Sequence, residues 1–174
     1  MKILLHICCG VCATSIIERL RSESNEVSGL FYNPNIYPME EYEKRLKATK
    51  KIAKKMKLVL FEGQYVPQEW FNLTKNYSEF PEGGLRCNIC YEMRLKYTYD
   101  FCKSNNFDKF TTTLTVSPHK KSDIINEIGK KIGDKLFLET DFKKNNGFNR
   151  AIKIAKNWDL YRQNYCGCKY SMRS

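Results

Sequence analysis

The sequence predicts an α/β fold, in which a parallel β-sheet carries α-helices on both of its faces. Short apolar runs typical of buried strands alternate along the 174-residue chain with longer segments whose apolar residues recur every three to four positions. Strands that are connected through helices form parallel sheets with right-handed crossovers. We therefore expect one domain, residues 1–174, with its functional site at the carboxyl ends of the strands, where open α/β sheets bind ligands.

Five strands are expected, and the first two are the clearest. Residues 2–7 (KILLHI) form a short apolar run, which is typical of a buried strand. The second run is closed by the loop Asn33-Pro34-Asn35, since proline has no N–H to donate to a sheet. The expected strands are residues 2–7, 27–32, 58–61, 110–116 and 135–139.

Helices are expected between these strands. In the first helix, Ile16, Ile17 and Leu20 share one side, as the helical period requires. Ser122 is expected to cap a later helix that carries several isoleucines. The expected helices are residues 12–22, 39–57, 67–77, 88–104 and 148–158, together with the one that begins at Ser122.

The composition indicates a folded protein with a polyanionic partner. Hydrophobic residues make up 42% of the chain, which is enough to fill a core and excludes a disordered chain. The 30 Lys and Arg outnumber the 19 Asp and Glu, which gives a net charge of +11. Such a surplus favours nucleic acid as the partner, with ordinary solubility as the alternative. Most basic residues of the helix at 39–57 are expected on its solvated face.

No export or membrane segment is expected. The basic and apolar start of the chain breaks at Cys8, which is too early for an export signal. No stretch approaches the ~20 apolar residues that span a membrane. We therefore expect a cytoplasmic protein with no membrane partner. Closely spaced cysteines in such a protein are more often metal-binding or catalytic than disulfide-forming.

The eight cysteines are the most informative residues of the chain. All except Cys102 fall into three groups, each expected at the end of a strand or at one end of a helix. The groups lie in residues 6–12 (HICCGVC), 83–90 (GGLRCNIC) and 161–168 (YRQNYCGC). We expect one metal site that draws on Cys8, Cys9, Cys12, Cys87, Cys90, Cys166 and Cys168.

The spacing within these groups suits a metal. A Cys-x-x-Cys turn brings two sulfurs to one metal ion or to adjacent irons of a cluster. Gly83 and Gly167 allow backbone amides to approach the sulfurs, and a helix start near Cys87 favours the thiolate. The consecutive side chains of Cys8 and Cys9 are expected to diverge, so that they serve two metals or one thiol stays free.

Three kinds of site remain open on spacing alone. A structural zinc ion needs four thiolates, and the second and third groups provide that number. An iron–sulfur centre uses the same type of ligand. Redox thiols that form a disulfide bond are the third alternative. The surplus of thiols beyond four favours an iron–sulfur centre or a second metal.

Two residues that resemble metal ligands are expected outside the site. Cys102 follows Cys90 by twelve residues on the same expected helix, which places it ~18 Å away. It also shares an apolar stripe with Tyr91 and Leu95, so we expect a buried structural thiol. We expect His6 to be a buried, hydrogen-bonded histidine rather than a ligand.

Several motifs together resemble one known family. They are residues 6–10, 33–35, 41–45, 86–90, 112–114 with 117–118, and 161–168. The last motif is the most specific, because it is long and unusual in composition. On these motifs the chain resembles the QueH family, the cobalamin-independent epoxyqueuosine reductases, over nearly its whole length. Two positions depart from that family's pattern: Val11 stands where many relatives have proline, and Cys12 where some have aspartate.

The resemblance implies a reaction, a cofactor and a fold. Such enzymes reduce the epoxide of epoxyqueuosine to queuosine at the wobble position of tRNA, with electrons from an external donor. The family carries a [4Fe–4S] cluster, with a second iron position nearby. Its fold is similar to the Rossmann-like, nucleotide-hydrolase-like group, in which tRNA-thiolating enzymes bind ATP through a Gly/Ser-rich loop after the first strand. Cysteines take that place here, so we expect no ATP binding.

Within this resemblance, the candidate residues receive roles. We expect Tyr165 to protonate the departing oxygen, with Arg162 and Gln163 positioning the substrate. The expected cofactor ligands are Cys8, Cys9, Cys87, Cys90, Cys166 and Cys168, with Cys12 as a further metal ligand. The expected substrate-binding residues are Asn33, Ser117, His119 and Lys120. The last three lie in a basic loop that either contacts phosphate or is simply solvated.

Two other functions compete with a reductase. One is an ATP-using tRNA modification enzyme with a structural zinc, which the missing glycine-rich phosphate loop disfavours. The other is a non-enzymatic RNA-binding module stabilised by a metal. Such a module would not need more than four thiols.

Overall fold

The protein is built around one parallel sheet. The computed structural model describes residues 1–172. Four strands pair in the order β3-β2-β1-β4, and every pairing is parallel. Their bounds are Lys2–His6 for β1, Glu26–Phe31 for β2, Val59–Glu62 for β3 and Lys109–Thr112 for β4. The parallel sheet expected from the alternation of strands and helices is confirmed.

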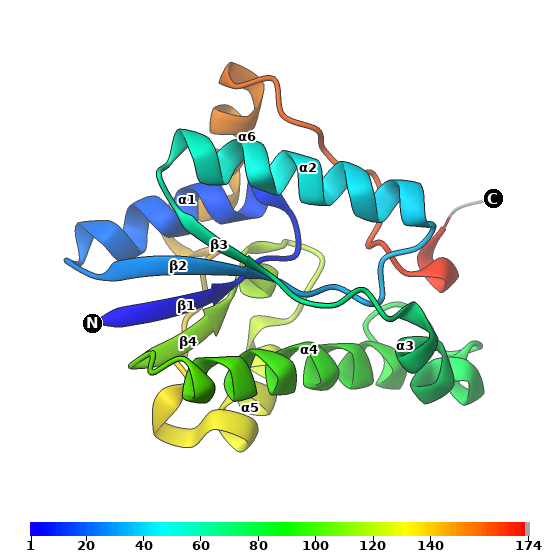
Figure 1. Cartoon of the computed structure of the whole chain (residues 1–174). Helices are drawn as coiled ribbons and strands as arrows, with labels where there is room; N and C mark the ends of the chain where they lie inside the picture. The colour runs from blue at the N-terminus through cyan, green and yellow to red at the C-terminus, as the bar shows by residue number, and fades with distance from the viewer. Residues whose placement is uncertain (173–174) are drawn as a thin grey trace.

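Helices cover both faces of the sheet. In Figure 1, α1, α2 and α6 lie above the sheet and α4 and α5 lie below it, which confirms the expected fold class. The α-helices are α1 (Gly10–Ser22), α2 (Met39–Lys55), α3 (Pro67–Thr74), α4 (Leu85–Ser104), α5 (Ser122–Gly133) and α6 (Gly147–Asn157). Short 3-10 helices are Lys75–Tyr77, Thr113–Val116, Asp134–Leu136, Lys144–Asn146 and Lys169–Ser171.

The expected strands at 110–116 and 135–139 are wrong in extent. Strand β4 ends at Thr112, because the Thr112 hydroxyl accepts a hydrogen bond from the backbone N–H of Leu114 (3.1 Å) and the chain turns into a 3-10 helix. The fifth strand is reduced to a single bridge between Phe110 and Phe137. A 3-10 turn over Asp134–Leu136 occupies its first residues.

Two helix starts also differ from expectation. Helix α5 has Lys121 at its N-cap position, so Ser122 is its first helical residue and does not cap it. Helix α4 begins at Leu85, three residues before the expected start, and Gly84 precedes it in an extended conformation. This earlier start places Cys87 and Cys90 in the first two turns of α4, with both side chains buried.

Strand β1 is the centre of the core. Its side chains alternate between the two faces of the sheet, so Ile3 and Leu5 pack with α1 on one face and Leu4 packs with α4 on the other. All three are fully buried, as expected for the middle strand of a sheet covered on both sides. The strand therefore places the residues that follow it, Ile7 and then Cys8, inside the molecule.

The segments that follow the strands meet at one edge of the sheet. The backbone N–H of Tyr37, in the loop after β2, donates to the carbonyl of Gly167 (2.8 Å) and so ties the C-terminal segment to this edge. Figure 1 shows that segment, coloured orange to red, next to the start of α2 and beside α3. All three cysteine groups thus belong to segments of the same end of the molecule.

Cys102 lies apart from this edge, as expected. It is fully buried in the core between β4 and α4 with Leu95 and Phe110. Its thiol donates to the carbonyl of Phe107 (3.6 Å). Within residues 1–172, no helix has both the length and the apolar character needed to cross a membrane.

Candidate metal centre

The first thiol group consists of Cys8, Cys9 and Cys12, whose sulfur atoms all lie within 4.8 Å of one another. The expectation that Cys8 and Cys9 diverge is therefore wrong. Strand β1 has already ended at His6 and the backbone bends at Cys8, one residue before the N-cap Cys9 of α1, so the alternation of side chains along a strand does not apply to these two cysteines. Thiolates bound at ~2.3 Å in a tetrahedron lie roughly 3.8 Å apart, so this group can hold one metal ion.

Only one thiol of this group ionises readily. Hydrogen bonds from Cys12 and Cys9 hold the pKa of Cys8 well below its usual range, and the charge of Arg94 and the Thr113 hydroxyl add to the effect. The hydrogen bond from Cys12 lowers the pKa of Cys9. The hydrogen bond between Cys9 and Cys8 and the burial of Cys9 outweigh this effect and raise the pKa of Cys9 to about 12. Hydrogen bonds to Cys8 and Cys9 and burial raise the pKa of Cys12. Three thiolates at this spacing need a cation between them.

Two side chains from distant segments support the first thiol group. The Thr113 hydroxyl donates to the sulfur of Cys8 (3.3 Å) and accepts from its backbone N–H (3.0 Å). The Nε2 of Gln163 donates to the sulfur of Cys9 (3.1 Å). The hydrogen bonds orient the sulfurs, as supporting residues do around metal sites.

The second thiol group consists of Cys87 and Cys90 on α4 with Cys166 and Cys168 on the C-terminal segment. Cys90 and Cys168 pack together in one buried cluster. Burial, together with the nearby thiols of Cys166 and Cys168, raises the pKa of Cys87 and raises that of Cys90 to about 11. Among residues 1–172, three or more metal-ligating atoms come within 4.8 Å only in the first thiol group, so these four thiols are spaced more widely.

Two glycines shape the loops of the second thiol group. The backbone N–H of Gly83 donates to the sulfur of Cys87 (3.1 Å), and Gly83 adopts a positive φ of 86° that favours glycine. Gly167, at φ 117°, passes so close to Arg45 that an added Cβ would lie 2.8 Å from its Nη1. The expected approach of a glycine amide to a sulfur is confirmed at Gly83.

Two cations face the thiols, the buried Arg94 and the half-buried Lys120. Arg94 is 2% exposed, and its guanidinium donates to the side-chain oxygen of Asn33 (2.7 Å) and to the sulfur of Cys90 (3.8 Å). The Nζ of Lys120 lies 3.4 Å from the sulfur of Cys166. Burial lowers the pKa of Lys120, but the charges of Cys166, Tyr91 and Cys8 outweigh it and raise the pKa. The charge of Arg94 also acts on Cys8, so these cations link the two thiol groups.

A cavity of about 460 Å³ opens over this arrangement. It falls within the size range of small-molecule sites. Cys8, Cys12 and Cys166 line it together with Arg94. Of the residues expected to act on the substrate, the cavity is lined by Ser117, His119, Lys120, Arg162, Gln163 and Tyr165.

Comparison with known protein families gives a match over nearly the whole chain. The sequence model of the family described as "Epoxyqueuosine reductase QueH" matches residues 3–174. The chain belongs to the epoxyqueuosine reductase QueH family. Family membership makes the protein an oxidoreductase, as the resemblance of the motifs implied. The all-thiol donor set, the cations beside it and the cavity are thus features of a member of this family.

Three relatives illustrate the similarity, and each is named "Epoxyqueuosine reductase QueH". The protein of Streptococcus pyogenes serotype M1 is 39% identical over 99% of this chain and 71% of its own length. That of Thermotoga maritima is 35% identical over 98% of this chain and 90% of its own. The protein of Dehalococcoides mccartyi is 37% identical over 98% of this chain and 92% of its own length.

Asn33 and Tyr165 are held by the protein itself. Asn33 is 1% exposed, and it donates to the carbonyl of Ile7 (2.9 Å) while accepting from Arg94. The hydroxyl of Tyr165 donates to the carbonyl of Tyr37. Asn33 thus orients a cation of this reductase, and Tyr165 lines the cavity.

Arg45 was missed among the basic residues of α2. Six lysines of that helix are exposed as expected, but Arg45 is 2% exposed and pairs with Glu41 (2.6 Å). Its guanidinium also donates to the carbonyls of Tyr165 (3.1 Å) and Cys166 (3.0 Å), so it holds the third cysteine group in place. The spacing of Glu41 and Arg45 by four residues was the signal that could have revealed the pair.

His6 is the buried, hydrogen-bonded histidine that was expected. Its Nδ1 lies 2.8 Å from the hydroxyl of Thr112 and its Nε2 lies 3.1 Å from the carbonyl of Tyr32. Burial, with the charge of Arg94, lowers its pKa to about 3. The ring is therefore neutral and joins β1 to its neighbours. All eight cysteines are free thiols in the structure of residues 1–172, so the disulfide bond of the redox-thiol alternative is not found there.

Proposed function

We propose that the protein reduces the epoxide of epoxyqueuosine to queuosine at the wobble position of tRNA and that it uses an iron–sulfur cluster to do so. The observation that carries the proposal is the arrangement of two thiol groups, the buried Arg94 and the half-buried Lys120 around one cavity, in a chain that matches the reductase family over residues 3–174. Reduction of the epoxide consumes two electrons and two protons and releases water.

The two thiol groups suit two different metals. The first thiol group would hold a single iron, because its sulfurs are close enough for one ion. The second would hold a [4Fe–4S] cluster through Cys87, Cys90, Cys166 and Cys168, since a cluster spreads its ligands over several irons. When bound, the cluster supplies electrons one at a time from an external donor, and the single iron acts as a Lewis acid.

The residues of the cavity would bind and orient the modified base. His119 and Arg162 are exposed at the cavity and are suited to phosphate contacts. Gln163 is held against Cys9 and presents its amide to the same space. A base of the anticodon loop is unpaired and can be inserted into such a pocket.

Tyr165 is our candidate for the proton donor, provided that its hydroxyl can leave its present hydrogen bond. Its hydroxyl proton is engaged by the carbonyl of Tyr37. Burial and the charge of Glu41 raise its pKa, which keeps the hydroxyl protonated. To protonate the departing oxygen, the hydroxyl has to turn from Tyr37 toward the cavity.

The geometry after β1 argues against the ATP-using alternative. Gly10 lies where a phosphate-binding loop would need a free backbone, but it is packed against α2. A Cβ at Gly10 would lie 2.5 Å from Ile52 and 3.1 Å from the carbonyl of Ala48. The glycine therefore allows α1 and α2 to approach each other closely.

The test combines anaerobic purification with turnover. The protein should contain iron and sulfide, absorb broadly in the visible range and convert epoxyqueuosine in tRNA to queuosine under reducing conditions without cobalamin. Cys87→Ser should lose the cluster and turnover, because serine is a poor substitute for a thiolate. Cys102→Ser is the matched control and should keep both, since its partner, the carbonyl of Phe107, accepts from a hydroxyl as well. A colourless zinc protein, or an active Cys87→Ser variant, would contradict the proposal.

A further inference from the structure

Trp70 is the buried residue of helix α3 that touches the second thiol group. Its side chain is 1% exposed and packs in one cluster with Cys90 and Cys168. The indole N–H can donate a hydrogen bond but cannot accept one. Within residues 1–172, the Nε1 atom is buried and has no hydrogen-bond partner. Since buried donors are almost always paired, this one calls for an acceptor.

The neighbours of Trp70 offer few acceptors. Two of them are aromatic: Phe71 lies 5.3 Å from the indole between ring centres, and Tyr170 lies 5.6 Å away. Met93 also packs against this cluster, and its thioether is a weak acceptor. The strong acceptors in this cluster are the sulfurs of Cys90 and Cys168 once they are deprotonated.

The choice of tryptophan is informative because of the packing around it. The side chains that pack with Trp70 in this cluster are cysteine, methionine and aromatic residues, and phenylalanine would fit among them without bringing a polar atom. Tryptophan is used in cores where its N–H can reach a partner. Trp70 therefore brings a donor to a place where the folded chain alone gives it no acceptor.

We propose that the indole N–H of Trp70 donates a hydrogen bond to a sulfur of the cluster held by the second thiol group, and that it thereby raises the reduction potential of that cluster. Hydrogen bonds to the sulfurs are one of the factors that set cluster potentials, because they stabilise the more negative, reduced state. The inference rests on the proposed function, since it requires an iron–sulfur cluster. In this role Trp70 acts through the cluster, by setting the potential at which the cluster accepts an electron.

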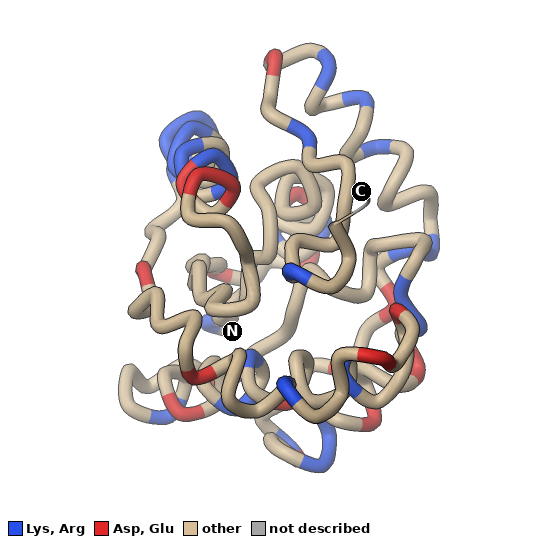
Figure 2. Tube along the Cα trace, turned by 90° about the vertical axis from the view of Figure 1, so that its right-hand side faces the viewer, with Lys and Arg blue, Asp and Glu red and all other residues tan. Residues whose placement is uncertain are grey.

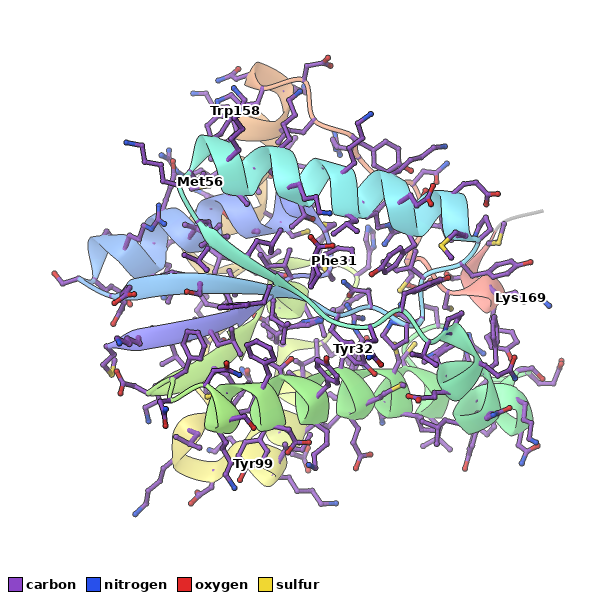
Figure 3. The ribbon with its side chains drawn as sticks, viewed as in Figure 1. Phe31, Tyr32, Met56, Tyr99, Trp158 and Lys169 are labelled. Carbon is purple, nitrogen blue, oxygen red and sulfur yellow. The ribbon has the colours of Figure 1, made fainter. Side chains whose placement is uncertain are left out.

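The chain provides a matched control for the test. It has two tryptophans, and the second is Trp158. Trp158 packs on a cluster without cysteine and lies under the Nζ of Lys55, 5.2 Å from the ring centre. Figure 3 shows Trp158 beside the end of α6, far from Lys169, the residue that follows Cys168. The same Trp→Phe change can thus be made near the thiols and away from them.

The experiment measures the reduction potential of the intact, cluster-containing protein by titration followed with EPR. Trp70→Phe should keep its iron and sulfide, and its potential should fall. A tenfold change in the ratio of oxidised to reduced cluster corresponds to about 59 mV for one electron, and a shift of this order is expected. Trp158→Phe should have the potential of the unchanged protein.

A second measurement identifies the hydrogen bond without activity and without the Trp70 variant. In Trp158→Phe, Trp70 is the sole indole, so labelling tryptophan with ¹⁵N marks its N–H alone. Pulsed EPR of the reduced cluster should detect the ¹⁵N and an exchangeable proton that disappears in deuterated water. If both couplings are missing, or if the potential of a fully loaded Trp70→Phe protein is unchanged, the inference is overturned while the proposed function stands. A protein that assembles no iron–sulfur cluster overturns both.

Discussion

Replacing Arg45 with methionine tests the structural reasoning most directly. The Arg45 guanidinium is 2% exposed, and it bonds to the carboxylate of Glu41 and to the carbonyls of Tyr165 and Cys166. Arg45→Met fills a similar volume but leaves the 8% exposed carboxylate of Glu41 without its cation. Breaking a buried pair by removing one partner costs about 3–5 kcal/mol.

The assay is urea unfolding of the metal-free protein under reducing conditions, which separates folding from metal binding. Arg45→Met should lose about 3–5 kcal/mol of unfolding free energy, and the double variant Glu41→Gln with Arg45→Met should recover part of it, since no unpaired charge stays buried. Lys47→Met, on the exposed face of α2, is the control and should change stability by less than about 0.5 kcal/mol. A loss in Arg45→Met as small as in Lys47→Met would refute the role of Arg45.

Three further predictions concern the site and its substrate. Cys102→Ala should keep its metal and activity and lose ~1 kcal/mol of stability, as judged by iron analysis and urea unfolding; loss of iron would contradict the structural role. Tyr165→Phe should bind tRNA and keep the cluster, but turn over about 10²–10⁴ times more slowly if its hydroxyl supplies the proton; full activity would remove Tyr165 from the chemistry. Affinity for tRNA, measured by filter binding, should fall steeply with salt, because bound phosphates release counterions.

The fold was largely predictable from local patterns, and its failures have a common cause. The middle of a buried strand such as β1 is apolar at consecutive residues, Ile3 to Leu5, and that pattern depends only on burial. The segment at 135–139 shows similar apolar residues, yet only Phe137 forms a bridge. An edge segment forms a strand only if its backbone runs alongside the neighbouring strand. Here a 3-10 turn over Asp134–Leu136 sets the direction of the backbone just before Phe137. Such tertiary effects are not visible in a single segment.

The candidate site was predictable in its thiols but not in its cations. Clustered cysteines are rare enough to stand out, and all three groups lie at the expected edge. Arginine and lysine are common on surfaces, so the burial of Arg94 beside Cys90 could not be inferred from residue type. The spacing of Cys90 and Arg94 by four residues on one helix places them on one face, which is a signal that could have found this contact.

The basic residues of the protein fall into two groups, one inside the protein and one on its surface. Arg45, Arg86 and Arg94 are each 3% exposed or less, and they bond to carbonyls or face thiols inside the protein. Lys120 is also turned toward a thiol. The three arginines are bonded inside the protein and are not free to neutralise phosphates.

The remaining charge lies outside and is the part that an RNA can contact. Figure 2 shows Lys and Arg along α2, viewed end-on, with glutamates at the near end of that helix. The lysines of α2 are exposed, whereas Glu41 at its near end is buried against Arg45. The salt dependence of tRNA binding should therefore reflect fewer phosphate contacts than the net charge of +11 suggests. Charge-neutralising substitutions on α2, such as Lys47→Met, should reduce that slope, and Arg94 should not contribute to it, because its guanidinium is committed to the metal centre.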